Sequence, residues 1–306
     1  MPYPLRHNDG TRICFITSRC FQARHLLRPG PEVNEIIGSV LARAQALYPE
    51  VTLYAFMAMS NHIHALAQAP AEAMAKFFGY VLGQIARRVN KLRGRRGKFW
   101  HRRFSCEQIV EDEANLERLE YLFLNPVKAG LCERTEDWVG FSTLPETLGA
   151  EPRTYEHVDK TALNRARRSD PEASADEFTE EHTLEVAPLP EFQDDPEGFA
   201  RQVEGMLERG EEHHRKLREA TGESVSSPER IRRLDPESRP EAPKRSPRPL
   251  CHAVTQAARK AYRKAYEAFC AAYRIASKAF REGRFDVPFP DHAFRPPVPA
   301  GVSAPG

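Results

Sequence analysis

The order of apolar segments in the first 126 residues is the feature that most constrains the fold of this chain. Runs that alternate apolar and polar residues, or short β-branched and aromatic runs, predict strands, whereas apolar residues three or four apart predict helices. The segments are a strand at 13–18, a helix at 31–47, strands at 51–59 and 62–68, a helix at 71–92, a strand at 99–110 and a helix at 112–125. This order predicts an α+β domain, with a ferredoxin-like antiparallel sheet and helices packed on one face.

The composition changes after residue 148. Residues 170–199 contain eleven acidic residues and no lysine or arginine. A segment of that kind cannot bury enough apolar surface to fold alone. We therefore expect a folded domain at 1–148, followed by a partly disordered, helical C-terminal extension. The extension is expected to be an acidic, proline-rich linker that can hold a short helix at 149–249, then a basic aromatic helix and a disordered tail at 250–306.

The helix expected at 252–282 carries an aromatic stripe with basic residues around it. The stripe comprises Tyr262, Tyr266, Phe269, Tyr273 and Phe280. Three interpretations are open: the stripe packs onto the rest of the protein, it self-associates as a coiled coil and makes a homodimer, or the helix with its basic flanks binds DNA.

Cysteine spacing and hydropathy bound the cellular context. The six cysteines contain no C-x-x-C pair, so the sequence suggests neither a zinc knuckle nor a disulfide framework. No window approaches the roughly 18 uninterrupted apolar residues that span a bilayer. We expect free thiols, no membrane partner and a cytoplasmic location.

Two histidines, His62 and His64, begin the strand expected at 62–68. Residues two apart in a strand point to the same face, so the two imidazoles would lie side by side. Such a pair can chelate one divalent cation. The alternative is a pair of hydrogen-bonded structural histidines, because no further His, Cys, Asp or Glu follows within the strand.

The helix at 112–125 carries Tyr121 and Asn125, which are four residues apart and share one helix face. A phenol beside a metal site suggests a nucleophile that forms a covalent intermediate. An amide oxygen of Asn125 would complete the metal shell. The alternative is a surface tyrosine and a helix C-cap before Pro126.

The most basic run of the chain lies between these elements, and aromatic residues interleave it. Basic side chains hold phosphates and flat rings stack on unpaired bases, so the run suits a nucleic acid of single-stranded or hairpin character. The alternative is a solvated helix end. The expected DNA-binding residues are Arg87, Arg88, Lys91, Arg93, Arg95, Arg96, Lys98, Trp100, Arg102 and Arg103. The acidic residues 170–199 could occupy this surface in the absence of DNA.

Three motifs together resemble a known family. In MSNHIHALAQ, GKFWHRRF and YLFLNPVKAGL, over residues 10–145, the chain resembles the REP-associated tyrosine transposases of bacteria, which are single-tyrosine HUH transposases. Ser60 stands where that family usually has proline, and His101 stands where it commonly has glutamine. Neither change removes a catalytic group.

The resemblance implies a role for each motif residue. It implies that His62 and His64 bind the catalytic metal, that Tyr121 is the nucleophile and that Asn125 is the third metal ligand. The implied reaction cleaves and rejoins single-stranded DNA at hairpin-containing sites through a 5′-phosphotyrosine, with Mg²⁺ or Mn²⁺ as cofactor. Two other functions stay open: a catalytically inactive DNA-binding regulatory protein, and a metal-dependent hydrolase.

Overall fold

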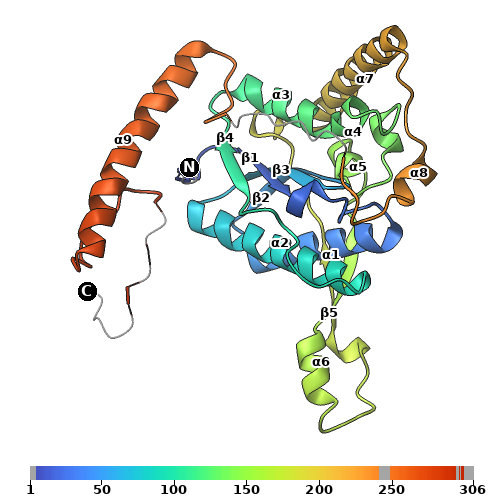
Figure 1. Ribbon diagram of the computed structural model, residues 1–306, viewed down its shortest axis with the longest axis horizontal. Coiled ribbons are helices and arrows are strands. Elements are labelled where there is room, and N and C mark those ends of the chain that lie inside the picture. The colour runs from blue at the N-terminus through green and yellow to red at the C-terminus, as the bar shows by residue number, and fades with distance from the viewer. Residues whose placement is uncertain (1–4, 241–248, 294–295, 297, 300–306) are drawn as a thin grey trace.

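A four-stranded antiparallel sheet forms the centre of the molecule (Figure 1). The computed structural model describes residues 5–240, 249–293, 296 and 298–299 of the 306-residue chain. The sheet order is β2-β3-β1-β4. The strands are β1 (Cys14–Arg19), β2 (Thr52–Met59), β3 (His62–Gln68) and β4 (Ser105–Gln108). With α1 between β1 and β2 and α2 between β3 and β4, this is the ferredoxin-like arrangement, which confirms the α+β prediction.

Local sequence patterns set most element bounds of this domain. Helices α1 (Pro31–Leu47) and α2 (Ala71–Leu92) have the expected bounds, as does β3. The strand expected at 99–110 is limited to β4, because Phe99 and Phe104, which precede β4, both pack in the same core cluster. Residues five apart in a regular strand point to opposite faces, so the backbone between them cannot be one strand.

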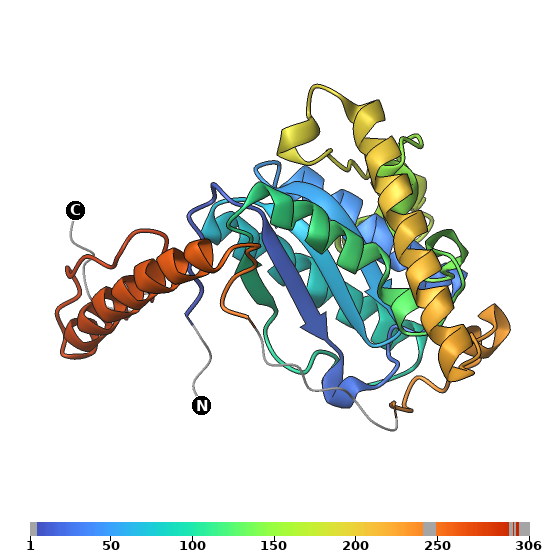
Figure 2. The same ribbon diagram turned by 90° about the horizontal axis from the view of Figure 1, so that it is seen from above.

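Helices α1 and α2 cover one face of the sheet as expected, and further helices cover the other face as well. Buried side chains of α1 and α2 pack with alternate strand residues such as Ile16 and Ile63. The other alternate residues, such as Phe15 and Leu66, pack with α3 (Asp112–Phe123) and with α7 (Pro196–Thr221). Figure 2 shows α3 and α7 on the side of the sheet opposite α1 and α2. The second face is apolar enough to need this cover.

Regular structure also fills the region expected to be a linker. It contains a two-stranded sheet of β5 (Thr154–Val158) and β6 (Thr179–Thr183), and the 26-residue helix α7. Tyr155 and Leu184 bury against α1, and four apolar residues of α7 bury against the sheet and α3. The few apolar side chains of this segment pack on a surface that the first domain already provides. The remaining elements are α4 (Asn125–Lys128), α5 (Leu144–Thr147), α6 (Lys160–Ala166), α8 (Pro228–Arg232) and short 3₁₀ turns at Phe21–Ala23, Thr135–Asp137, Asp176–Phe178 and Pro190–Phe192.

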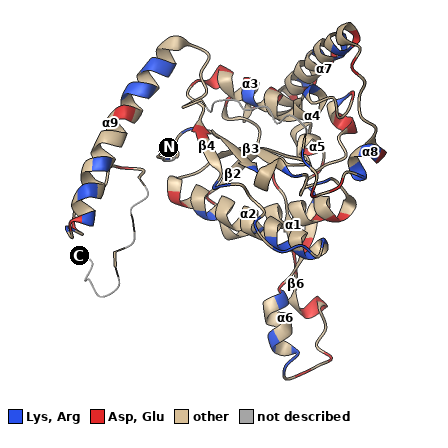
Figure 3. Ribbon diagram, in the orientation of Figure 1, with Lys and Arg blue, Asp and Glu red and all other residues tan. Residues whose placement is uncertain are grey.

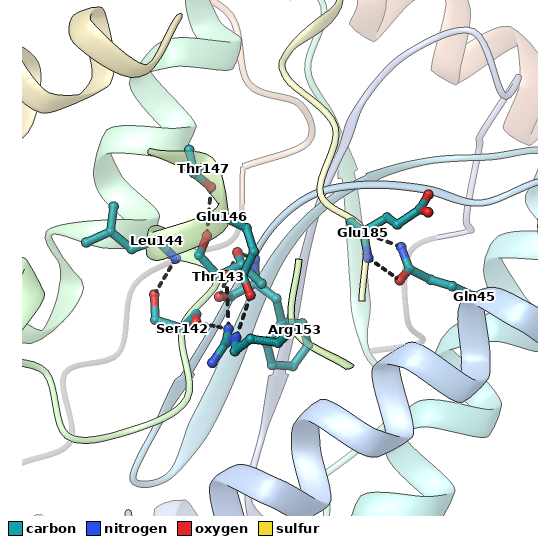
Figure 4. A network of polar contacts seen from close by, with 9 residues as sticks. Gln45, Ser142, Thr143, Leu144, Glu146, Thr147, Arg153 and Glu185 are labelled. Carbon is teal, nitrogen blue, oxygen red and sulfur yellow. Dashed lines mark hydrogen bonds and ion pairs between the residues drawn. The ribbon is translucent and has the colours of Figure 1, made fainter. Parts of the chain in front are cut away.

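A polar network joins this region to the first domain (Figure 4). The Arg153 guanidinium forms an ion pair with Glu146, whose side chain is only 3% exposed, and donates a 2.7 Å hydrogen bond to the Ser142 carbonyl. The Gln45 side chain of α1 exchanges two hydrogen bonds with the Glu185 backbone. The network therefore fixes β5 and the chain after β6 against the domain.

The aromatic stripe of the C-terminal helix α9 (Gln256–Arg281) is partly covered by the chain itself. The Tyr266 hydroxyl donates a 2.9 Å hydrogen bond to the Leu5 carbonyl, and His7 lies 4.7 Å from Phe269 between ring centroids. Beyond α9, Phe289 packs against Phe280. Of the disordered tail expected at the end of the chain, residues 294–295, 297 and 300–306 lie outside the described residues. Within the described residues, no helix is long and apolar enough to cross a membrane.

Candidate active site

The register of β1 and β3 brings the histidine pair to one face of the sheet. Arg19 pairs with His62 and Thr17 pairs with His64 across the two strands. The two imidazoles point to the same face, with ring centroids 4.8 Å apart. His64 is 4% exposed and stacks on Phe15 at 4.9 Å. The expectation of side-by-side imidazoles is therefore confirmed.

Helix α3 places Tyr121 over this pair. The Tyr121 ring lies 5.7 Å from the His64 ring and 5.9 Å from the Phe15 ring, between centroids. Two cations flank it, with Arg118 Cζ and Lys128 Nζ each 5.2 Å from the ring centre. Tyr121 thus lies beside the histidines of its own chain.

Asn125 begins α4, and its side chain lies close enough to His62 to act on the pKa of that imidazole. The C-cap of α3 is Leu124, so the C-cap interpretation of Asn125 is wrong. The two short helices follow one another directly. The four residues singled out from the sequence, His62, His64, Tyr121 and Asn125, therefore converge on one side of the sheet.

Both imidazoles favour the neutral form. Burial is the main cause that lowers the pKa of His62 to about 3, with a smaller contribution from Arg19. Burial also lowers the pKa of His64 well below its ordinary value, and the neighbouring His62 and Arg19 add to this effect. A neutral imidazole is the form that binds a metal ion, so no proton has to leave before binding.

The remaining ring nitrogens are oriented by hydrogen bonds. Thr17 Oγ1 lies 2.9 Å from His64 Nδ1, and Asn61 Oδ1 lies 2.6 Å from His62 Nδ1. Partners of this kind fix the ring orientation of metal-ligating histidines. No group of three His, Cys, Asp or Glu side chains that could hold a metal is found among the described residues. The side chains here that could hold a divalent cation are two imidazoles and one amide, a set that would leave positions for phosphate and water.

A cavity of about 1000 Å³ opens beside these residues and is lined by His64 and Tyr121. Its walls are strongly basic. They carry two glutamates, Glu107 and Glu117, and six arginines, namely Arg19, Arg102, Arg118, Arg239, Arg259 and Arg263. Such a wall attracts a polyanion.

Comparison with known proteins identifies the family. No protein-family model matches the sequence. A Haemophilus influenzae protein assigned by name to the REP-associated tyrosine transposases is 30% identical, and the match covers 34% of this chain and 70% of that protein. This chain belongs to the REP-associated tyrosine transposases.

Two solved structures are also similar to this chain. One is a REP-associated tyrosine transposase bound to a REP hairpin, with 18% identity, a TM-score of 0.41 and coverage of 48% of this chain and 85% of that one. The other is a crystal structure of a Deinococcus radiodurans protein named as a transposase, with 17% identity, a TM-score of 0.28 and coverage of 35% and 86%.

The basic run of this transposase does not form one continuous surface. Arg102 lines the cavity with Tyr121. Arg88 of α2 donates hydrogen bonds to Ser39 and His157, on the face of the sheet opposite Tyr121. Arg87 and Lys91 are exposed and belong to the same helix. The other side chains lie around the loop after α2. Arg93 donates a hydrogen bond to the Arg28 carbonyl, and Arg95 forms an ion pair with Glu237. Trp100 donates a hydrogen bond to the Leu82 carbonyl, Lys98 lies over the Phe21 ring, and Arg96 and Arg103 are exposed.

The acidic stretch 170–199 makes an ion pair with another part of the described chain. Its Glu180 pairs with Arg43 of α1, and the acidic partner of Arg95 is Glu237 of a later segment. The position of each acidic residue depends on long-range packing, which its local composition does not reveal.

Sequence reasoning missed several residues of the transposase site. Thr17 and Arg19 follow the apolar residues of β1, and only the β1–β3 register aligns them with the histidines. His252 comes from far along the chain, yet its ring lies 5.3 Å from Phe15 and its Nε2 lies 3.6 Å from Glu107. Neither the apolar run before Thr17 nor the sequence near His252 carries a local signal that points to these residues.

Proposed function

We propose that this protein cleaves and rejoins single-stranded DNA through a phosphotyrosine on Tyr121. The observation that carries the proposal is the convergence of His62, His64, Tyr121 and Asn125. Two of them, His64 and Tyr121, line a basic cavity. Chance would not readily place a pair of neutral imidazoles, an amide and a phenol together there. Family membership supports the same assignment of roles.

The proposed reaction is a transesterification. The Tyr121 oxygen attacks the phosphorus atom as the bond from phosphorus to the 3′ oxygen breaks. The phenol loses its proton, and the 3′ oxygen gains one. The products are a 5′-phosphotyrosine and a free 3′-hydroxyl, and attack by another 3′-hydroxyl reverses the step and joins two strands without an external energy source.

A divalent cation, Mg²⁺ or Mn²⁺, is part of the proposal. When bound, it would polarise the scissile phosphate and offset its developing negative charge. His62, His64 and Asn125 would hold it, while Thr17 and Asn61 keep the two rings oriented. Arg118 and Lys128 lie beside the Tyr121 ring, where their positive charges would attract the scissile phosphate.

The proposed substrate is hairpin-containing single-stranded DNA. The excess of arginine over glutamate in the cavity wall suits the DNA backbone. We infer the hairpin in the substrate from the family, because one solved REP-associated tyrosine transposase is bound to a REP hairpin. We place this activity in the bacterial cytoplasm.

A denaturing-gel assay tests the proposal. Labelled single-stranded DNA with hairpins is incubated with the protein and Mn²⁺ or Mg²⁺, beside Tyr121→Phe, His62→Ala and a sample with EDTA. We expect an SDS-resistant adduct that is lost in all three. Tyr80→Phe is the matched control, because Tyr80 is half-buried on α2, on the other face of the sheet, and it should keep the adduct.

The two other functions give different results in this assay. Cleavage without an adduct would indicate a metal-dependent hydrolase. Binding without cleavage across many hairpins would indicate a DNA-binding regulatory protein. Either result would overturn the phosphotyrosine mechanism.

A further inference from the structure

The beginning of α9 is attached to the free edge of the catalytic sheet. The His252 backbone donates to the Gln108 carbonyl and accepts from the Val110 N–H, each at 2.9 Å, in a short parallel pairing with β4. The Thr255 N–H and hydroxyl both donate to the Glu111 carboxylate, at 2.8 and 2.7 Å. Thr255 also caps the helix by accepting from the Ala258 N–H. The first turn of α9 therefore has a fixed position relative to Tyr121.

The aromatic and basic faces of α9 have different surroundings. Tyr262, Tyr266 and Phe269 point toward the N-terminal segment and are wholly or partly buried there. Arg259 and Arg263 instead line the cavity that also contains His64 and Tyr121. The aromatic stripe of this half of the helix is thus used for attachment, and it orients the basic face toward the active site.

The two arginines differ in what they contact. Arg259 donates two hydrogen bonds to the Ala253 carbonyl, at 3.1 and 2.6 Å from Nε and Nη2, and so stabilises the turn before the helix. Arg263 is exposed, and among the described residues it has no hydrogen bond or ion pair. Over its length α9 contains seven lysines and arginines and one acidic residue, Glu267 (Figure 3). A guanidinium without an internal partner is available for a phosphate.

We propose that the first turns of α9 form the second wall of the DNA groove, and that Arg263 binds a backbone phosphate of the strand that Tyr121 attacks. The inference rests on the proposed function and deepens it, because it gives the C-terminal extension a role in substrate binding. The partner is single-stranded DNA, and the charge of the shared cavity and its continuity with Tyr121 support this choice.

The test compares charge reversal at two adjacent positions of the full-length protein. Arg263→Glu and Lys264→Glu make the same kind of charge change one residue apart on α9, and both residues are exposed, but only Arg263 lines the cavity. Affinity for a hairpin-containing single strand is measured in a Tyr121→Phe background, so that no turnover occurs, at several salt concentrations. Circular dichroism and thermal melting check that both variants fold.

We expect Arg263→Glu to weaken binding by roughly tenfold, as loss of a charge-assisted phosphate contact would. The slope of log affinity against log salt should fall by about 0.7, the value for one phosphate contact on a single strand. Lys264→Glu should change affinity by no more than about twofold, as an exposed charge without a specific contact would.

Equal effects of the two variants on affinity and slope would overturn the inference. So would a change in oligomeric state with Arg263→Glu in light scattering, because the surface would then be a protein interface. The adduct assay with unmodified Tyr121 is read separately. If the wild type forms the adduct but Arg263→Glu binds like Lys264→Glu, only this inference fails. If no adduct forms but Arg263→Glu still weakens binding, the DNA contact stands and the phosphotyrosine mechanism fails.

Discussion

Thr17 and His64 face each other across β1 and β3, with the Thr17 hydroxyl oxygen 2.9 Å from His64 Nδ1. This contact fixes the His64 ring and leaves its other nitrogen directed away from Thr17. We expect Thr17→Val, which keeps the shape but removes the hydroxyl, to raise the metal concentration needed for half-maximal adduct formation by about 10- to 100-fold. A titration of Mn²⁺ in the adduct assay measures this.

The neighbouring Ser18 provides the control for that variant. Ser18 is also buried on β1 but points to the opposite face. Ser18→Ala should leave the metal titration unchanged. If Thr17→Val titrated like the wild type, Thr17 would have no part in orienting His64.

Asn125 provides a second test of the metal site. Asn125→Ala removes the oxygen that is next to His62, and we expect the metal requirement to rise by at least about tenfold. Asn125→Asp keeps an oxygen ligand and should restore adduct formation in Mn²⁺. If both variants required the same metal concentration as the wild type for adduct formation, Asn125 would not be a metal ligand.

Two glycines test how the region after residue 148 is attached. A Cβ added to Gly38 of α1 would lie 2.2 Å from Tyr155 Cζ, whereas one added to Gly79 of α2 meets no atom within 4 Å. We expect Gly38→Ala to lower the free energy of unfolding by about 1–3 kcal/mol and Gly79→Ala to raise it by up to about 1 kcal/mol. Urea denaturation measures both. Equal stabilisation would show that β5 does not pack on α1.

The Arg153–Glu146 pair gives a further stability prediction. Because the Glu146 side chain is 3% exposed, Arg153→Met leaves a buried carboxylate without its cation and should cost about 2–3 kcal/mol of unfolding free energy. Adding Glu146→Gln removes that charge and should recover part of the loss. A double variant no more stable than Arg153→Met, measured by urea denaturation, would contradict this explanation.

Local patterns predicted the parts of the fold that local physics determines. The apolar spacing of α1 and α2 and the alternation around His62 and His64 set those elements and the shared face of the two rings. The partners of these elements depend on contacts between distant residues. Thr17 meets His64 only through the strand register, and His252 reaches the site only because its backbone pairs with β4.

The acidic region shows why average composition was misleading there. Its charge suggested a linker, yet Tyr155 and Leu184 bury against α1, and Phe199 and Val203 bury against the second face of the sheet. A few apolar side chains are sufficient when a folded domain already presents a complementary surface. Composition describes what a segment can do alone and does not include that surface.

The identity of the amino acid joined to DNA tests the central claim most directly. Wild-type protein is trapped with a hairpin-containing single strand and Mn²⁺, digested with a nuclease and a protease, and analysed by mass spectrometry. We predict that the peptide that contains Tyr121 carries a nucleotide through its 5′ phosphate. Attachment at any other residue, or cleaved DNA with no nucleotide-bearing peptide, would contradict the assignment of Tyr121 as the nucleophile.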